Sequence, residues 1–588
     1  MKFPYGIADF AAIRQEGYFY QDRTHLIPSL EAAGKQLLFL RPRRFGKSLL
    51  LSMLEHYYDI NQADSFASLF GDLAIGQNPT PLQNRYFILH WDFSDVSCQG
   101  DVGTIEKALH EHINDRLRDF IACYQTRLSL PIQINASNAL SSWRSALTAV
   151  RQAGHTVYLF IDEYDNFANE ILMARKDQYE ALLYGEGLFK TVFKAVKAAA
   201  GQGLDRVFMT GVSPVALSDI TSGYNVATNI YLEPEFNTLC GFTETEMDSL
   251  VENLIESGIN QSKTVVMATL RTFYNGYRFA EEEVESVYNP TLSLYFLKAL
   301  QKQDKVPKEM LDDNLAMDRK RLVFIAGLLE GESLLLEALS QEQGLVIQRI
   351  SRRFGAETML KPERDRDTLI SLLYYFGILT LAGITGLNKL AMKIPNLVSR
   401  SLYIEQLQDI YLSSAADRNS LSNVPDALFL RGDLQPVCAF IESRLFPVLS
   451  NRDYRWSNEL AIKVIFMMML YNDRVYMMVS ETEVHHGYAD LSLIVRPDTR
   501  RFQALDLVLE FKYLGLQELG LSGEAVRAQS HEILCRIPQV AEKLKEAREQ
   551  ALRYGQALKD RYNLTAITGF AVVALGLERI VFERIESS

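Results

Sequence analysis

The chain of 588 residues is short of several features, and each shortage excludes a class of protein. Its five cysteines are scattered without a CxxC pair, which argues against a disulfide framework or a zinc site and suits a reducing compartment. The most apolar stretch, Val464–Tyr471, is far too short to cross a bilayer, and the N-terminal segment lacks the apolar core of a signal peptide. We therefore expect a cytoplasmic protein with no membrane partner.

Basic residues are outnumbered by acidic ones, with 61 Lys and Arg against 73 Asp and Glu, so the formal net charge is −12 at pH 7. This balance argues against binding nucleic acid through overall charge, although a local basic groove stays open. The length exceeds what one hydrophobic core supports and predicts about three or four domains.

A phosphate-binding loop is predicted at residues 35–48, KQLLFLRPRRFGKS, where an apolar strand runs into a loop and then a helix. Backbone N–H groups and the positive helix end would cradle phosphates, Lys47 would reach the β and γ oxygens, and Ser48 would hold Mg²⁺. The residues expected at the phosphates are Arg44, Phe45, Gly46, Lys47, Ser48 and Leu49.

One position departs from the GxxxxGK[ST] pattern. Arg41 stands where the first glycine belongs, so the loop must turn without a residue that tolerates positive φ. The competing interpretation is an ordinary strand–turn–helix with a solvated lysine.

A second motif lies about a hundred residues downstream. The apolar strand 155–160 runs into Ile161 and then two acids, the form of a Walker B motif. Asp162 would bind Mg²⁺ through its water shell, and Glu163 would polarise the attacking water. With strands at 86–93 and 206–210 alternating with helices, the pattern predicts a parallel sheet covered on both faces. Thr210 and Ser213, at the end of the last strand, are candidates for the polar sensor that AAA+ proteins place there.

From about residue 239 the pattern becomes helical. Arg278, in the aromatic stretch 273–279, is a candidate to reach nucleotide phosphates from a helical lid, although a packed helix end explains the stretch equally well. Basic clusters at 318–321 and 349–353 are either solvated helix faces or DNA contacts. Strands at 378–382 and 389–394 predict a β-hairpin and suggest a winged-helix module.

The C-terminal part predicts the order αβββαβ, with a long helix from about 523 to 554 and a last strand at 565–573. Asp490, Glu510 and Lys512 would meet at one end of this sheet, because residues i and i+2 of a strand share a face. Two carboxylates suit Mg²⁺ or Mn²⁺, and a lysine can orient water or stabilise charge on a phosphorane-like transition state. A solvent-exposed ExK pattern is the alternative. His485 and His486 lack a third zinc ligand and are interpreted as groove residues.

These motifs resemble two known families. Residues 3–235, with RPRRFGKS, VYLFIDEYDN and MTGVSP, resemble the AAA-ATPase-like family of bacteria and archaea, and residues 455–575, with GYADL and LVLEFKYL, resemble the PD-(D/E)xK nuclease superfamily. The resemblance implies the P-loop and Walker B roles above and assigns no arginine finger. It also implies a nuclease core made of Asp490, Glu510 and Lys512. Glu459 would be a further acid near the metal, and Gln550 with Tyr554 matches a QxxxY helix signature. Ala489 replaces the proline of the superfamily motif, at a position that varies widely.

The predicted fold class is α/β and multidomain. We expect a P-loop AAA+ parallel sheet (1–235), a helical lid (236–304), a mostly helical, winged-helix-like middle (305–425) and a restriction-endonuclease-like αβββαβ domain (426–588).

The predicted function is ATP binding and hydrolysis coupled to a metal-dependent DNA nuclease, with nucleotide state controlling assembly or cleavage and a role in defence against foreign DNA as an analogy. ATP and Mg²⁺ are the expected cofactors, with Mn²⁺ as an option at the nuclease site. DNA is the expected partner, while RNA and a homo-oligomer stay open. The rival hypothesis is an ATP-switched scaffold, or a regulator that binds DNA or a partner, with an inactive nuclease fold.

Overall fold

The structure is a computed structural model, and it falls into two compact units, each described below by itself. Unit 1 comprises residues 1–259, 275–302 and 346–395, and unit 2 comprises residues 260–274, 303–345 and 396–588. The residues described are 1–166, 169–170, 188–214, 226–282, 284–311, 322–328, 330–340, 344–352, 354, 365–412, 414–421, 423–450, 458–479, 482–484 and 487–586.

The core of unit 1 is a five-stranded sheet in the order β2-β3-β4-β1-β5, and every pair in it is parallel. The strands are β1 (Gln36–Leu40), β2 (Phe87–Asp92), β3 (Val157–Asp162), β4 (Leu204–Gly211) and β5 (Thr228–Asn229). The first four confirm the predicted strands, whose apolar runs suit a sheet buried on both faces. Strand β4 lies between β1 and β3, so the carboxyl ends of these three strands share one edge.

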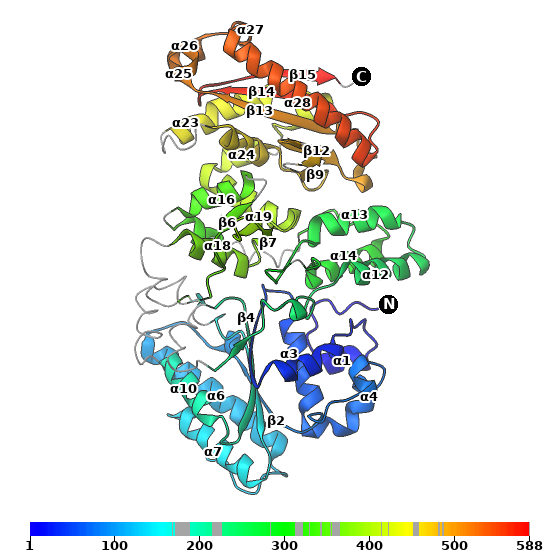
Figure 1. Cartoon of the computed structure of the whole chain (residues 1–588), viewed down its shortest axis with the longest axis vertical. Coiled ribbons are helices and arrows are strands. Elements are labelled where there is room, and N and C mark those ends of the chain that lie inside the picture. The colour runs from blue at the N-terminus through cyan, green and yellow to red at the C-terminus, as the bar shows by residue number, and fades with distance from the viewer. Residues whose placement is uncertain are drawn as a thin grey trace. The chain divides into compact units, whose positions relative to one another are not determined.

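Helices cover both faces of this sheet (Figure 1), with α3 and α1 on one side and α6, α7 and α10 on the other. The helices in the described part of unit 1 are α1 (Phe10–Gln15), α2 (Ile27–Ala33), α3 (Lys47–Tyr58), α4 (Phe66–Phe70), α5 (Ala74–Gln77), α6 (Val102–Tyr124), α7 (Ala139–Gln152), α10 (Leu188–Ala199), α12 (Glu244–Glu256), α14 (Pro290–Gln303) and α18 (Arg366–Tyr375). Helix α12 begins with a capping box between Thr243 and Glu246, as the threonine and the acids of its first turn predict.

The hairpin predicted near residue 385 is present. Strands β7 (Thr380–Ile384) and β8 (Leu390–Lys393) pair antiparallel, and β6 (Leu345–Ile347) completes a three-stranded sheet in the order β6-β8-β7. The winged-helix assignment of this part stays a prediction, and so do the boundaries of the four predicted domains.

Unit 2 contains a mixed five-stranded sheet in the order β15-β14-β13-β12-β9. Its strands are β9 (Tyr476–Val479), β12 (Leu491–Val495), β13 (Leu507–Leu514), β14 (Thr568–Leu575) and β15 (Arg579–Glu586), and a separate hairpin joins β10 (Thr482–Val484) to β11 (Gly487–Ala489). Only β13 and β14 run parallel. Strand β15 was not predicted, although the alternating pattern RIVFERIE after the turn at Gly576 is the signal for it.

The single helix predicted over 523–554 is wrong. Residues 523–535 form two short helices, α26 (Gly523–Ala528) and α27 (His531–Cys535), and the long helix α28 spans Pro538–Tyr562. Pro538 explains the break, because a proline suits the first turn of a helix and forces the residue before it out of the helical region. The helix ends at Asn563, whose φ of 51° is left-handed.

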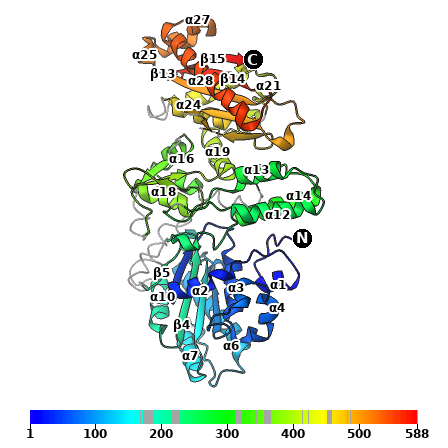
Figure 2. The same ribbon diagram turned by 45° about the vertical axis from the view of Figure 1, so that its right-hand side comes forward.

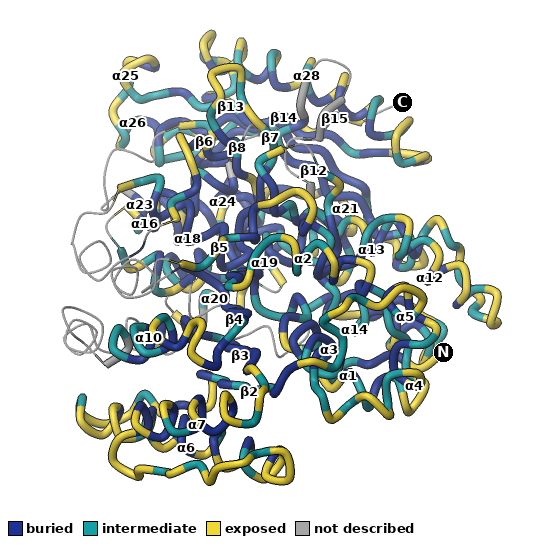
Figure 3. The backbone as a smooth tube through the Cα atoms, turned by 60° about the horizontal axis from the view of Figure 1, so that its bottom comes forward, coloured by how far each residue is buried: buried dark blue, intermediate teal, exposed yellow. Residues whose placement is uncertain are grey.

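Within its described residues, unit 2 also contains the following helices, of which α24 packs against β13. They are α13 (Lys263–Tyr274), α16 (Gly331–Ser340), α19 (Leu397–Tyr411), α20 (Ala415–Leu421), α21 (Asp426–Arg431), α22 (Gln435–Phe440), α23 (Phe446–Ser450), α24 (Glu459–Leu470) and α25 (Leu516–Leu519). Figures 2 and 3 show α28 across the sheet strands, which are mostly buried, while the outer side of the helix is exposed. Among the residues described, no helix combines the length and apolar character needed to cross a membrane, and all five cysteines are free thiols.

Candidate functional sites

The predicted P-loop lies between β1 and α3. Gly46 is the N-cap of α3 with a φ of 84°, a left-handed conformation that glycine adopts without strain. Arg44 is also left-handed, with a φ of 67°. The positive φ values therefore fall at these two positions and not at Arg41, so the loop turns without a glycine at its first position.

Arg41 has a structural role that the sequence did not reveal. Its side chain is buried, and its guanidinium donates hydrogen bonds to three carbonyl groups. These belong to Leu40 and Tyr231, each at 2.8 Å, and to Phe236 at 2.6 Å. It also lies 4.4 Å from the ring centroid of Phe39 and 4.0 Å from that of Phe279. Arg41 thus ties the start of the P-loop to the segment after β5 and to the aromatic stretch at 273–279.

The side chains predicted to hold Mg²⁺ meet at the carboxyl edge of the sheet. Ser48 donates to the carboxylate of Asp162 at 2.6 Å, and Thr210 bonds to its other oxygen. Asp162 is buried at the end of β3 and also accepts the backbone N–H of Glu163 at 2.9 Å. Oxygen ligands of this kind suit the hydrated Mg²⁺ that accompanies a nucleoside triphosphate.

Lys47 begins α3 and is buried. Its Nζ donates to the carbonyl groups of Arg41 at 3.1 Å and Pro42 at 3.2 Å. Burial lowers the pKa of Lys47, while the charges of Asp162 and Glu163 oppose that shift. A cationic group placed beside the loop's N–H groups is suited to an anionic ligand.

Glu163 has a strained backbone, with a φ of 48°. Its side chain lines the cavity next to the P-loop, and burial raises its pKa. A carboxyl with a raised pKa beside a phosphate site is suited to accept a proton from water or to orient it.

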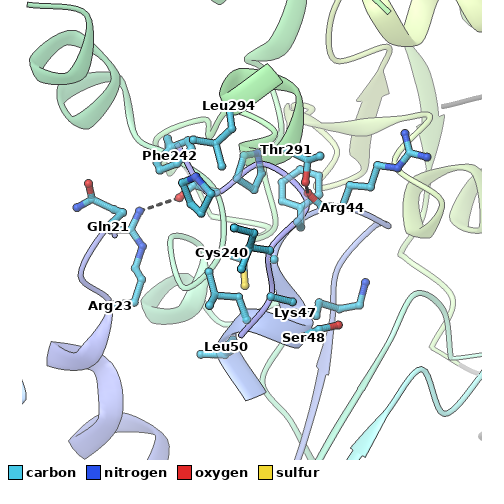
Figure 4. A pocket seen from close by; sticks show the side chains of 18 of the residues that line it. Gln21, Arg23, Arg44, Lys47, Ser48, Leu50, Cys240, Phe242, Thr291 and Leu294 are labelled. Atoms are coloured by element: carbon cyan, nitrogen blue, oxygen red, sulfur yellow. Dashed lines mark hydrogen bonds between the residues drawn. The ribbon is translucent and has the colours of Figure 1, made fainter. Parts of the chain in front are cut away.

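A cavity of about 390 Å³ opens beside the P-loop (Figure 4). Its walls come from the N-terminal segment, the lead-in to α2, the P-loop, the segment before α12 and the start of α14. Figure 4 shows Cys240 and Phe242 among the side chains facing this space, while the side chain of Arg44 extends away from it. Arg23 is held in its wall by hydrogen bonds to Gly241 at 2.7 Å and Glu246 at 2.6 Å. The mixed apolar and polar lining suits a flat heterocycle attached to phosphates.

Three of the predicted nucleotide contacts do not line this cavity, namely Ser213, Arg278 and Thr210, whose hydroxyl bonds to Asp162. Ser213 donates through its N–H and its hydroxyl to the carboxylate of Asp165, at 2.7 and 2.9 Å, and does not line the cavity. Arg278 is not on a helix but in the segment between α13 and α14, where its N–H donates to Thr380 at 2.8 Å. Direct contact of Thr210, Ser213 or Arg278 with a nucleotide therefore stays a prediction.

In unit 2, the predicted nuclease residues gather where β12 and β13 begin to pair. The backbone N–H of Asp490 donates to Glu510 at 3.0 Å, and that of Phe511 donates to Asp490 at 2.9 Å. Lys512 donates to Glu459 of α24 at 3.0 Å and to the carbonyl of Phe511 at 2.8 Å. The structure therefore brings Asp490, Glu510, Lys512 and Glu459 into one cluster.

The two central carboxyls repel one another when both are ionised. Burial and then the charge of Asp490 raise the pKa of Glu510 well above its usual value. Burial likewise raises the pKa of Glu459, with Lys512 opposing the shift. A bound cation would relieve this repulsion. Within the described part of the chain, no group of three or more His, Cys, Asp or Glu side chains is arranged to hold a metal ion. Two carboxylates still fit Mg²⁺, which commonly binds one or two of them and keeps several waters.

The QxxxY residues lie on α28, which packs against β13 and β14. Tyr554 is buried and its hydroxyl accepts a hydrogen bond from Arg553 at 2.9 Å. The side-chain oxygen of Gln550 is buried without a hydrogen-bond partner. His485, His486, Arg353 and the basic cluster 318–321 lie outside the described residues.

Two family models match this chain. Residues 4–221 match the AAA-ATPase-like family, described as a predicted AAA-ATPase, and residues 457–584 match the PD-(D/E)XK nuclease superfamily.

A curated relative is an uncharacterized protein in the vnfD 5' region of Azotobacter chroococcum mcd 1, 26% identical over 303 residues. That match covers 50% of this chain and 52% of the relative, so the chain spans about half the length of the curated relative it matches.

Among solved structures, the Aeropyrum pernix ORC1 protein in complex with DNA is 10% identical, with a TM-score of 0.26, and the match covers 69% of this chain and 91% of that one. The Aeropyrum pernix ORC2 protein is 11% identical, with a TM-score of 0.31, and the match covers 69% and 98%. At these low TM-scores, the fold assignment depends on the strand order and the family matches. The chain therefore joins an AAA-ATPase-like segment to a segment of the PD-(D/E)XK nuclease superfamily.

Proposed function

We propose that this protein binds and hydrolyses ATP in unit 1 and cleaves DNA with Mg²⁺ or Mn²⁺ in unit 2, with nucleotide state controlling assembly or cleavage. The observation that carries the proposal is the presence of two separate clusters suited to phosphate chemistry. One joins Lys47, Ser48, Asp162 and Thr210 beside a cavity, and the other joins Asp490, Glu510, Lys512 and Glu459.

In unit 1, the loop N–H groups and Lys47 would bind the β and γ phosphates, while Ser48 and Asp162 would hold the nucleotide's Mg²⁺. Glu163 would orient and deprotonate the attacking water. The cavity walls formed by residues 4–8, residues 19–21 and Arg23 would receive the base.

In unit 2, Asp490 and Glu510 would hold the metal, which supplies Lewis acidity at the scissile phosphate. Lys512 would stabilise negative charge on the transferring phosphate, and Glu459 holds its ammonium group in place. Gln550 and Tyr554 would support this site from α28. By analogy, the proposed biological role is defence against foreign DNA.

The proposal is tested by a cleavage assay on linear, circular and single-stranded DNA, with an RNA substrate in parallel, using Mg²⁺ or Mn²⁺ with and without ATP. Wild type is expected to cleave DNA, and its rate or product pattern is expected to change with ATP. The same preparation is assayed for phosphate release from ATP. Cleavage that is identical with and without ATP, in a protein that hydrolyses ATP, would refute the proposed control.

A second candidate is an ATP-switched scaffold or a regulator that binds DNA or a partner, with an inactive nuclease fold. It is favoured by the finding that, in the residues described, no group of three metal-ligating side chains is arranged for an ion. ATP hydrolysis and DNA binding without cleavage, at any Mg²⁺ or Mn²⁺ concentration, would support this candidate against the first.

A further inference from the structure

The acid that follows the Walker B pair, Asp165, has no role in the proposed function above. It is 1% exposed, and its carboxylate accepts four hydrogen bonds. Asn169 donates at 2.7 Å, the N–H of Val212 donates at 2.9 Å, and the N–H and hydroxyl of Ser213 donate at 2.7 and 2.9 Å. Three of the four donors therefore belong to the segment immediately after β4.

The neighbouring residues make the same connection. Tyr164 is fully buried, its N–H donates to the carbonyl of Thr210 at 3.0 Å, and its hydroxyl donates to the carbonyl of Ser213 at 2.7 Å. Asn166 accepts a hydrogen bond from the P-loop residue Arg43 at 2.7 Å. The turn after β3 is thus attached to both the end of β4 and the P-loop.

This attachment brings the side chains of Asp165 and Tyr164 close against the backbone of Gly211. A Cβ atom added at Gly211 would lie 2.5 Å from the carboxylate of Asp165 and 2.7 Å from the ring of Tyr164. Real Cβ atoms do not make such contacts, so any larger residue at position 211 would have to displace the side chains of Asp165 and Tyr164. The fit leaves the turn little freedom to move away from β4.

Glu163 lies in the middle of this attachment. Its φ of 48° is a conformation that a non-glycine residue keeps only where the surroundings hold it. The carbonyl of Glu163 accepts the N–H of Asn166 at 2.9 Å, which closes the turn. Asp165 itself does not line the cavity, whereas Glu163 does.

We propose that Asp165 is a positioning residue that clamps the turn after β3 onto the end of β4 and thereby fixes the carboxylate of Glu163 toward the nucleotide cavity. The clamp comprises Asp165, Tyr164, Gly211 and Ser213. The inference depends on the proposed ATPase function, since it assigns the clamp to the hydrolysis step. Nucleotide binding depends on Lys47 and the loop N–H groups, which the clamp does not supply.

The experiment compares Asp165→Asn with wild type in the full chain. The amide puts an N–H₂ group against backbone N–H donors, so the turn loses its anchor. We expect kcat for ATP hydrolysis to fall about 100-fold, the cost of misplacing a catalytic group by about 1 Å, while KM and the Kd of a fluorescent ATP analogue change less than about twofold. Asp205→Asn, at the far end of β4, is the matched control and is expected to keep wild-type kcat.

A double-mutant cycle separates positioning from general destabilisation. On a Glu163→Gln background, Asp165→Asn is expected to cost less than about threefold in kcat, because the group it positions is already gone. If the double variant instead loses kcat by the full product of the two single losses, the inference is overturned. If the wild-type protein binds ATP but does not hydrolyse it, both the proposed ATPase function and the clamp are refuted. If the wild type hydrolyses ATP and Asp165→Asn is equally active, only the clamp is refuted.

Two milder variants decide the question if Asp165→Asn does not fold. Ser213→Ala removes one of the four donors and keeps the carboxylate, and Gly211→Ala pushes a methyl group against it. Each is expected to lower kcat about threefold to tenfold with KM unchanged. Full activity in both folded variants would overturn the clamp.

Discussion

The cluster beside the P-loop and the cluster on β12 and β13 contain similar residues but distribute charge in opposite ways. In unit 1, the buried Lys47 stands beside Asp162, whose oxygens accept hydrogen bonds from Ser48 and Thr210. In unit 2, burial and the charge of Asp490 raise the pKa of Glu510, and Lys512 donates a hydrogen bond to Glu459.

This difference indicates what each cluster needs. The P-loop cluster supplies a cation and backbone donors, so it is suited to receive an anion that brings its own Mg²⁺. The carboxylate cluster has an excess of acid in a buried place, so it is suited to receive a cation before the phosphate arrives. The two sites should therefore respond separately to nucleotide, metal and pH.

The largest expected effect separates the two sites through Lys512. Lys512→Ala should lower DNA cleavage about 10²- to 10³-fold, because it removes the positive charge that stabilises the transition state, while ATP hydrolysis stays at the wild-type rate. Cleavage rates on labelled DNA and phosphate release from ATP measure the two activities. Lys545→Ala, on the exposed side of α28, is the matched control. Wild-type cleavage in Lys512→Ala would remove this residue from the proposed mechanism.

The converse change is Lys47→Ala in the P-loop. ATP hydrolysis should fall about 10²-fold or more and nucleotide binding should weaken, because the phosphates lose their lysine contact. Cleavage measured without ATP should be unchanged, whereas its response to ATP should disappear. Lys107→Ala, on the exposed face of α6, serves as the control. An ATP response that persists in Lys47→Ala would show that nucleotide acts elsewhere.

The response to pH should distinguish the carboxylate cluster. Because the pKa of Glu510 is raised, this side chain keeps a proton at pH values where an ordinary glutamate is ionised, and Mg²⁺ must displace it. Mg²⁺ affinity measured by calorimetry should therefore increase with pH between 6.5 and 8.5, by up to about tenfold per unit for one proton. Glu510→Gln should bind weakly with no pH dependence. A wild-type Kd that is flat over this range would contradict the assignment.

The raised pKa of Glu510 also predicts how the free energy of unfolding depends on pH in the absence of metal. The folded-state pKa of Glu510 lies above the unfolded-state value, so folding favours the protonated form. The free energy of unfolding should therefore fall as pH rises above the usual glutamate pKa, and Mg²⁺ should offset that loss. Urea titrations at two pH values, with and without Mg²⁺, measure it.

The last expected effect is on stability and concerns Arg41. Arg41→Gly restores the glycine of the common P-loop pattern but removes three hydrogen bonds and two ring contacts. We expect a loss of about 2–4 kcal/mol in the free energy of unfolding, since charged hydrogen bonds in buried places are costly to remove. Denaturant unfolding measures it, and Arg43→Gly is the comparison in the same loop. An unchanged or increased stability would show that Arg41 is dispensable.

Local patterns determined much of what the sequence predicted. The strands β1 to β4, the start of α3 at the P-loop and the hairpin β7–β8 follow from apolar periodicity, caps and glycines within short windows. The prediction of one helix over 523–554 is wrong because Pro538 begins a new helix despite the continuous amphipathic pattern. Strand β15 has an alternating apolar pattern that the prediction missed.

The sequence alone therefore determined the two motifs, the α/β class and the residue types of both sites. Only the tertiary structure decided which side chains touch. Asp165 and Ser213 are 48 residues apart, Lys512 and Glu459 are 53 apart, and Arg41 reaches Phe236 across 195. Such contacts depend on strand order, register and the packing of helices against the sheets. Spacing in the sequence does not encode them, because each bond needs two distant backbones placed to within a few tenths of an ångström.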